Sequence, residues 1–267
     1  MTNSAPIGVF DSGMGGLTVV REMISQLPNE SIIYFGDTAR VPYGPKSPDT
    51  VLRYSREITS FLEGEGVKVL VVACNTATAH ALPALREEFK FPIIGVIEPG
   101  ARAAVAVTKT KRVGVIGTAG TIKSRAYEKE IVRLLPDADV TAQACALFVP
   151  LVEEGWLDSE VTRAVARNYL APLVAADVDT LVLGCTHYPL MKTVIGNVMG
   201  RDVRLIDSAH ETARQAGEVL RANGLENEIP NTARYRFISS DAPDTFLALG
   251  QTFLGSSIDR VETRTLG

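Results

Sequence analysis

Short apolar runs alternate with longer amphipathic segments along most of the chain. The apolar runs are about four to eight residues long and rich in Val and Ile, as in strands that are buried on both faces of a parallel sheet. We predict strands at residues 7–10, 31–35, 67–73, 93–97, 112–116, 140–144, 180–183 and 204–206. We predict helices at residues 17–27, 48–62, 76–89, 119–135, 159–175, 188–198 and 209–222. This order of elements predicts an α/β protein in which helices flank mainly parallel sheets.

The front half of the chain resembles the back half. Residues 8–13 have the form of residues 114–120, and residues 70–76 match residues 181–186 at nearly the same spacing. Two matches at one spacing favour an internal duplication and therefore two similar α/β lobes. Chance similarity between βα units is the alternative. No linker rich in Pro, Gly or Ser separates the halves, so we expect the lobes to share a tight interface.

Composition and net charge indicate which kind of molecule the protein binds. The chain has 267 residues, of which 46% are hydrophobic and 22% charged, which are ordinary proportions for a globular protein. A net charge of -4 disfavours a general nucleic-acid or anionic-membrane binder, so we expect a small-molecule ligand, no nucleic acid and no membrane. The first residues lack a signal-peptide pattern, and three cysteines make no disulfide framework. We therefore expect a cytoplasmic protein.

Two of the cysteines stand where a parallel sheet presents its ligands. Cys74 and Cys185 each come at the end of a predicted strand and are followed by polar residues. Ligands of open α/β sheets bind beyond the carboxyl ends of the strands, so both thiols should face one crevice between the lobes. A thiol at a helix start should also have a lowered pKa, because the positive end of the helix dipole favours the thiolate. Cys145 lies in an apolar run and fits a buried core residue instead.

Three kinds of chemistry use thiolates. Zinc is one, with Cys74, Cys185, His187 and His80 as the available ligands, but their spacing lacks the closely paired ligands of a structural zinc site. A cysteine hydrolase is another, with Cys185 and His187 as nucleophile and base, but it leaves Cys74 without a role. Inversion of a carbon centre uses both thiols, because one removes a proton from one face and the other returns a proton to the opposite face.

Polar side chains near each thiol favour the inversion of a carbon centre by the two thiols. Asp11 ends the first predicted strand, where it is placed to hold a substrate ammonium or to orient Cys74. His187 is placed to do the same for Cys185, and its ordinary pKa suits proton exchange near neutral pH. Glu153 is a candidate to orient His187, although an exposed charge is the alternative there.

Two loops offer backbone N–H groups to an anion. Residues 11–16 form a glycine-rich turn between a strand and a helix, and Thr118, Gly120 and Thr121 form the matching turn of the second half. Such turns suit a substrate carboxylate or a phosphate. The first loop lacks the Gly-Lys-Ser/Thr ending of a P-loop and the pattern of a dinucleotide site, so no nucleotide cofactor is predicted.

Four segments together resemble the glutamate racemase family. They are GVFDSGMGG at 8–16, GDTARVPYG at 36–44, ACNTAT at 73–78 and GCTHYPL at 184–190, and the similarity runs from about Ile7 to His210. The resemblance implies interconversion of L- and D-glutamate without cofactor or metal, supplying D-glutamate for peptidoglycan. It also implies two flavodoxin-like lobes and a homodimer. The first lobe would be residues 1–97 with 208–267, and the second residues 98–207.

The resemblance also implies residue roles. Cys74 would act on the α-proton of D-glutamate with help from Asp11, and Cys185 on that of L-glutamate with help from His187 and Glu153. Substrate would be held by Asp11, Ser12, Tyr43, Gly44, Asn75, Thr76, Thr118, Thr121, Thr186 and His187. Two alternatives stay open: an aspartate racemase with a pocket shaped for one fewer methylene, and a non-catalytic amino-acid sensor on the same scaffold.

Overall fold

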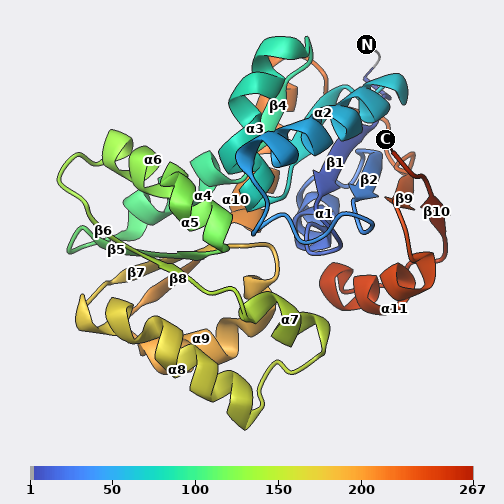
Figure 1. Cartoon of the computed structure of the whole chain (residues 1–267). Helices are drawn as coiled ribbons and strands as arrows, with labels where there is room; N and C mark the ends of the chain where they lie inside the picture. The colour runs from blue at the N-terminus through green and yellow to red at the C-terminus, as the bar shows by residue number, and fades with distance from the viewer. Residues whose placement is uncertain (1–2, 267) are drawn as a thin grey trace.

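The computed structural model describes residues 3–266 and contains two all-parallel sheets (Figure 1). The six-stranded sheet has the order β10-β9-β2-β1-β3-β4 and the four-stranded sheet the order β6-β5-β7-β8. The strands of the first are β1 (Ile7–Asp11), β2 (Ile32–Gly36), β3 (Val69–Val72), β4 (Ile93–Gly95), β9 (Tyr235–Ser239) and β10 (Val261–Thr263). Those of the second are β5 (Arg112–Gly117), β6 (Asp139–Ala144), β7 (Thr180–Gly184) and β8 (Arg204–Asp207). The two sheets with their helices form the six-stranded lobe and the four-stranded lobe.

Helices cover both faces of the six-stranded sheet. One face carries α2 (Pro48–Gly64) and α3 (Asn75–Glu88), whose apolar side chains pack on alternate strand residues such as Phe10 and Val72. The other face carries α1 (Leu17–Gln26), α10 (Ser208–Ala222) and α11 (Pro243–Leu254). Strands buried on both faces explain the continuous apolar runs in the sequence.

The four-stranded sheet is covered in the same way. Helices α4 (Ile97–Val107), α5 (Ala119–Ser124) and α6 (Ala126–Leu134) pack on one face. Helices α8 (Glu160–Ala175) and α9 (Lys192–Met199) pack on the other, together with the short α7 (Phe148–Glu153) and the 3-10 helix η1 (Tyr188–Met191). None of these helices, nor any other within residues 3–266, has the length and apolar character needed to cross a bilayer.

The two sheets share one topology. The order β2-β1-β3-β4 corresponds strand for strand to β6-β5-β7-β8, and every one of these pairings is parallel. The α/β class and the two similar lobes that the sequence predicts are therefore confirmed. Because β3 and β7 hold equivalent places, the residues that follow them, Cys74 and Cys185, also hold equivalent places.

Some predicted elements differ from the structure. The helix predicted over 119–135 is two helices, because Arg125 adopts a left-handed conformation with φ 56 and breaks the run. The strand predicted over 93–97 ends at Gly95, and α4 begins at Ile97 with Pro99 and Gly100 in its first turn, a pair more typical of a loop. The elements after residue 222, which are β9, α11 and β10, were not predicted. The two strands are short, and only their pairing beyond β2 makes them strands.

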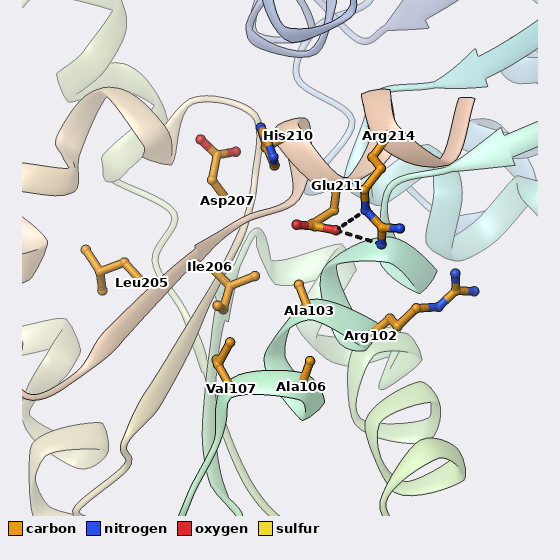
Figure 2. A pocket seen from close by; sticks show the side chains of 10 residues that line it. All are labelled: Arg102, Ala103, Ala106, Val107, Leu205, Ile206, Asp207, His210, Glu211 and Arg214. Atoms are coloured by element: carbon orange, nitrogen blue, oxygen red, sulfur yellow. Dashed lines mark hydrogen bonds and ion pairs between the residues drawn. The ribbon is translucent and has the colours of Figure 1, made fainter. Parts of the chain in front are cut away.

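The chain returns from the four-stranded sheet at the end of β8. Asp207 caps α10 by accepting a hydrogen bond from the Ala209 N–H at 3.0 Å. A surface pocket of about 550 Å³ lies at this junction between α4, β8 and α10 (Figure 2). In it the Arg214 guanidinium is paired with the Glu211 carboxylate at 2.9 Å. The packing of α10 against both α1 and α4 ties the lobes together on this side.

Candidate active site

A small enclosed cavity lies between the two lobes. Its volume is about 30 Å³, which is too small for an amino acid, so the walls must separate before one enters. It is lined by Asp11, Ser12, Val41, Pro42, Tyr43, Gly44, Cys74, Asn75, Thr76, Thr118, Val149, Cys185, Thr186 and His187. The residues to which the resemblance gives a role are all in this lining except Glu153 and Thr121, which lie behind it and bind lining residues.

Cys74 stands between the end of β3 and the start of α3. It is the N-cap of α3, and its Sγ accepts a hydrogen bond from the Ala77 N–H at 3.5 Å and lies 3.7 Å from the Ser12 hydroxyl. The expectation of a lowered pKa is wrong for this thiol. Burial raises the pKa of Cys74 to about 12, with a further contribution from the Asp11 carboxylate, and these outweigh the two hydrogen bonds. Cys74 therefore keeps its proton at neutral pH.

Asp11 is the carboxyl-terminal residue of β1 and lies beside Cys74. Its Oδ2 accepts a hydrogen bond from the Gly13 N–H at 3.2 Å, whereas its buried Oδ1 has no hydrogen-bond partner within residues 3–266. Burial raises the pKa of Asp11, and the positive charge of His187 opposes that rise. An acceptor of this kind, facing the cavity, suits a substrate ammonium or a thiol proton.

Cys185, His187 and Glu153 form a chain of hydrogen-bonding groups. The Cys185 Sγ lies 3.9 Å from His187 Nδ1, and His187 Nε2 lies 3.0 Å from Glu153 Oε1. Burial lowers the pKa of His187, but its hydrogen bonds to Cys185 and Glu153 outweigh that effect and raise it to about 10. The imidazole is therefore an imidazolium at neutral pH, which stabilises negative charge on the adjacent sulfur.

The two thiols thus have unlike surroundings, although the sequence suggested the same environment twice. The segment after Cys185 is the 3-10 helix η1 and not a longer α-helix, so His187 and not a helix dipole supplies the positive charge. Phe253, from the far carboxyl-terminal helix α11, packs edge-on against the His187 ring at 5.1 Å between centroids. Phe253 was missed by sequence reasoning, because nothing local to it signals the contact.

Polar side chains from both lobes line the cavity near Cys74. The hydroxyls of Thr76, Thr118 and Thr121 lie 2.9 to 3.3 Å from one another, with Thr76 in the six-stranded lobe and the others in the four-stranded lobe. The buried Nδ2 of Asn75 has no hydrogen-bond partner within the described chain. These groups offer donors to an anion such as a carboxylate.

Tyr43 and Gly44 complete the wall on one side. The Tyr43 hydroxyl donates to the Asp37 carboxylate, which also binds Arg40 and Ser240. The phenol is therefore committed to Asp37, and the Tyr43 main chain is what remains for a ligand. The Gly44 carbonyl accepts a hydrogen bond from the Gly120 N–H of the other lobe at 2.9 Å, which closes the cavity here.

The glycine-rich loop after β1 packs directly on the opposite lobe. A Cβ on Gly15 would lie 2.6 Å from Cε1 of His187, so only glycine allows this approach. The Thr18 hydroxyl lies 3.3 Å from the Thr186 carbonyl, which adds a second contact across the interface. The tight interface expected from the missing linker is confirmed. Val41, Pro42 and Val149 line the cavity but were not predicted, because apolar side chains carry no chemical signal in sequence.

The structure gives less support to the zinc-site and cysteine-hydrolase hypotheses for these thiols. Within residues 3–266, no three His, Cys, Asp or Glu side chains gather as a metal ion would require. His80, a zinc candidate, lines a different pocket from Cys74. A hydrolase would use Cys185 and His187 alone, yet Cys74 lines the same cavity. Cys145 is buried in the core, as its apolar surroundings predicted.

The fold and the cavity define a class: two-lobed parallel α/β proteins in which each lobe presents one thiol to a closed interlobe cavity. The sequence profile of the Asp/Glu/Hydantoin racemase family matches residues 7–216. The chain belongs to this family of isomerases, and within it to the glutamate racemases.

Three comparisons support that second step. The chain is 57% identical over 255 residues to a glutamate racemase of Geobacter metallireducens, a match that covers 96% of this chain and 94% of that protein. A crystal structure of a glutamate racemase isoform of Bacillus anthracis matches with a TM-score of 0.95 at 44% identity and covers 98% of both chains. A structure of the Francisella tularensis glutamate racemase in complex with D-glutamate matches with a TM-score of 0.93 at 39% identity, again over 98% of both chains.

Proposed function

We propose that the protein interconverts L- and D-glutamate by proton transfer at the α-carbon, with Cys74 and Cys185 as the two catalytic residues on opposite faces of the substrate. The observation that carries this proposal is the placement of both thiols in the lining of one closed cavity, each from a different lobe. The similarity to glutamate racemases along almost the whole chain supports glutamate as the substrate.

The surroundings of the two thiols suit a base on one side and an acid on the other. Cys185, whose sulfur lies 3.9 Å from Nδ1 of the His187 imidazolium, is the residue that removes the α-proton of L-glutamate. Cys74, whose buried thiol has a pKa raised to about 12, is the acid that protonates the opposite face. The reverse reaction starts from the opposite protonation of the pair. Asp11 is proposed to assist Cys74, and His187 with Glu153 to assist Cys185.

The cavity supplies what a weak carbon acid requires. Negative charge grows on the α-carboxylate as the proton leaves, so fixed donors and exclusion of water lower the barrier. We propose that Asn75, Thr76, Thr118 and Thr186 provide donors to the carboxylates, with Thr121 holding Thr76 and Thr118 in place. Ser12, Tyr43 and Gly44 complete the pocket, and Asp11 and His187 also contact substrate. No cofactor and no metal enter this scheme.

The cellular role and organisation follow from the same proposal. D-Glutamate made here would supply peptidoglycan synthesis in the cytoplasm, where the three buried thiols stay reduced. We propose residues 1–97 with 208–267 as one lobe and 98–207 as the other, of which residues 1, 2 and 267 lie outside the described part. A homodimer is proposed by analogy with the family.

The direct test is proton NMR of L-glutamate in deuterated water with the purified protein and no added cofactor, followed in parallel by circular dichroism. Loss of the α-proton signal together with decay of optical activity is the expected result. Exchange of L-aspartate but not of glutamate would move the substrate to aspartate. No exchange of either amino acid would favour an amino-acid sensor.

Single variants test the pair of thiols. Cys74→Ser and Cys185→Ser should each abolish racemisation, because a serine hydroxyl is far too weak an acid to replace a thiol in either role. Cys145→Ser is the matched control, since Cys145 lies in the core and not in the cavity lining, and it should leave kcat nearly unchanged. Turnover near that of the wild type in either cavity variant would refute the two-thiol mechanism.

A further inference from the structure

One buried tyrosine reaches from one lobe to the other beside the cavity. Tyr127 belongs to α6 of the four-stranded lobe and is 2% exposed. Its hydroxyl donates to Oδ1 of Asn75, the first residue of α3 in the six-stranded lobe, at 2.8 Å. No feature of the sequence around Tyr127 predicted this contact, because the two residues are 52 positions apart.

Tyr127 also contacts the segment that carries the second thiol. A Cβ on Gly184 would lie 3.0 Å from Cε2 of the Tyr127 ring, so the ring packs directly on the residue before Cys185. The hydroxyl binds Asn75, which is the residue after Cys74. One side chain thus contacts the immediate neighbours of both thiols.

The hydrogen bond decides which way the Asn75 amide faces. A tyrosine hydroxyl has a single proton, and Tyr127 donates it to Oδ1 of Asn75. With Oδ1 held by Tyr127, Nδ2 has no partner within residues 3–266 although it is buried. Asn75 is part of the cavity lining, so its free N–H groups are available to a ligand in the cavity. Leaving a buried donor unsatisfied is costly unless a ligand takes it up.

We propose that Tyr127 is a positioning residue that holds the Asn75 amide with Nδ2 toward the substrate carboxylate. Because Tyr127 and Asn75 belong to different lobes, separating the lobes breaks their hydrogen bond and releases the amide. The carboxylate donor is therefore in place only in the closed state, which links closure of the lobes to recognition of the substrate. This inference rests on the proposed function, since it concerns the same cavity.

The test is Tyr127→Phe, which keeps the ring and removes the hydroxyl. KM for both glutamate enantiomers should rise about tenfold, as for loss of one hydrogen bond to a charged ligand, while kcat changes less than about threefold. The matched control is Tyr169→Phe in the same lobe, whose hydroxyl accepts from the Leu147 N–H at 3.3 Å and which does not line the cavity. The control should leave KM unchanged. An unchanged KM in Tyr127→Phe overturns the inference.

A second variant shows whether Tyr127 acts through Asn75. In an Asn75→Ala background, Tyr127→Phe should have no further effect on the dissociation constant of D-glutamate measured by calorimetry. Equal effects of Tyr127→Phe with and without Asn75 would indicate a merely structural role and overturn the inference.

Two further measurements separate the possible failures. If Tyr127→Phe does not fold, 4-fluorophenylalanine at position 127 replaces it, because it fills the space of the hydroxyl without donating a hydrogen bond, and KM should rise about tenfold; an unchanged KM there also overturns the inference. Calorimetry measures the binding of glutamate without requiring turnover. Wild-type protein that binds glutamate but does not racemise it would refute the proposed function alone.

Discussion

Neutralising Glu153 tests whether the Glu153–His187 pair sets the charge beside Cys185. In Glu153→Gln the amide still hydrogen-bonds His187 but no longer balances its positive charge. The imidazolium is then less stable, and the pKa of His187 should fall from its value of about 10. Because a histidine with a raised pKa keeps its proton at low pH and loses it as the pH rises, the change appears on the alkaline side.

The size of the change follows from the geometry. A hydrogen bond between charged groups is worth about 1.5–3 kcal/mol, and the Glu153 side chain is 34% exposed, so solvent screening favours a value near or just below the low end. About 1.4 kcal/mol is one pKa unit, which places the His187 pKa in the variant near 9. At pH 7 the imidazolium stays protonated in both proteins, so the rates there should differ by less than about threefold.

The assay is kcat/KM measured from pH 6 to 11 in both directions. The alkaline limb should move from about pH 10 in the wild type to about pH 9 in the variant. Racemisation has an equilibrium constant of one, so kcat/KM must fall by the same factor for L- and D-glutamate. Comparing the two directions therefore tests whether the measurements agree with each other. Glu154→Gln is the matched control, because Glu154 is exposed and does not contact His187. An unmoved alkaline limb, or a hundredfold loss already at pH 7, would refute the reasoning.

Three further outcomes are expected. Gly15→Ala should lower kcat/KM at least tenfold with the fold retained, because the new Cβ would lie 2.5 Å from Nδ1 of His187 and must displace that ring; wild-type activity would contradict the interlobe packing. Lys68→Met should lower the free energy of unfolding in urea by about 3–5 kcal/mol, because it leaves the buried Glu30 carboxylate, whose Oε2 lies 2.5 Å from Lys68 Nζ, without its charged partner. Adding Glu30→Gln to this variant should restore part of the lost stability. Dialysis against a metal chelator should leave activity unchanged, since residues 3–266 hold no cluster of metal-ligating side chains; loss that zinc restores would revive a metal site.

Much of the fold was determined by the sequence alone. Strands buried on both faces produce continuous apolar runs, and helices on the sheet surface produce amphipathic ones, so both element types could be located from local pattern. The similarity between the two halves of the sequence predicted two similar lobes, and both sheets have one topology with Cys74 and Cys185 at equivalent strand ends. Because ligands of parallel sheets gather at those ends, the shared cavity of the thiols followed from position in the chain.

The tertiary structure determined the pKa values of those residues and their contacts across the two lobes. Burial beside Asp11 raises the pKa of Cys74, opposite to what its helix-start position suggested, and hydrogen bonds to Cys185 and Glu153 raise the pKa of His187. Phe253 and Tyr127 reach the site from segments with no local signal of their role. A pKa and an interlobe hydrogen bond both depend on which groups lie within a few ångströms of one another. Local patterning of the chain determines the elements, but only their packing determines those distances.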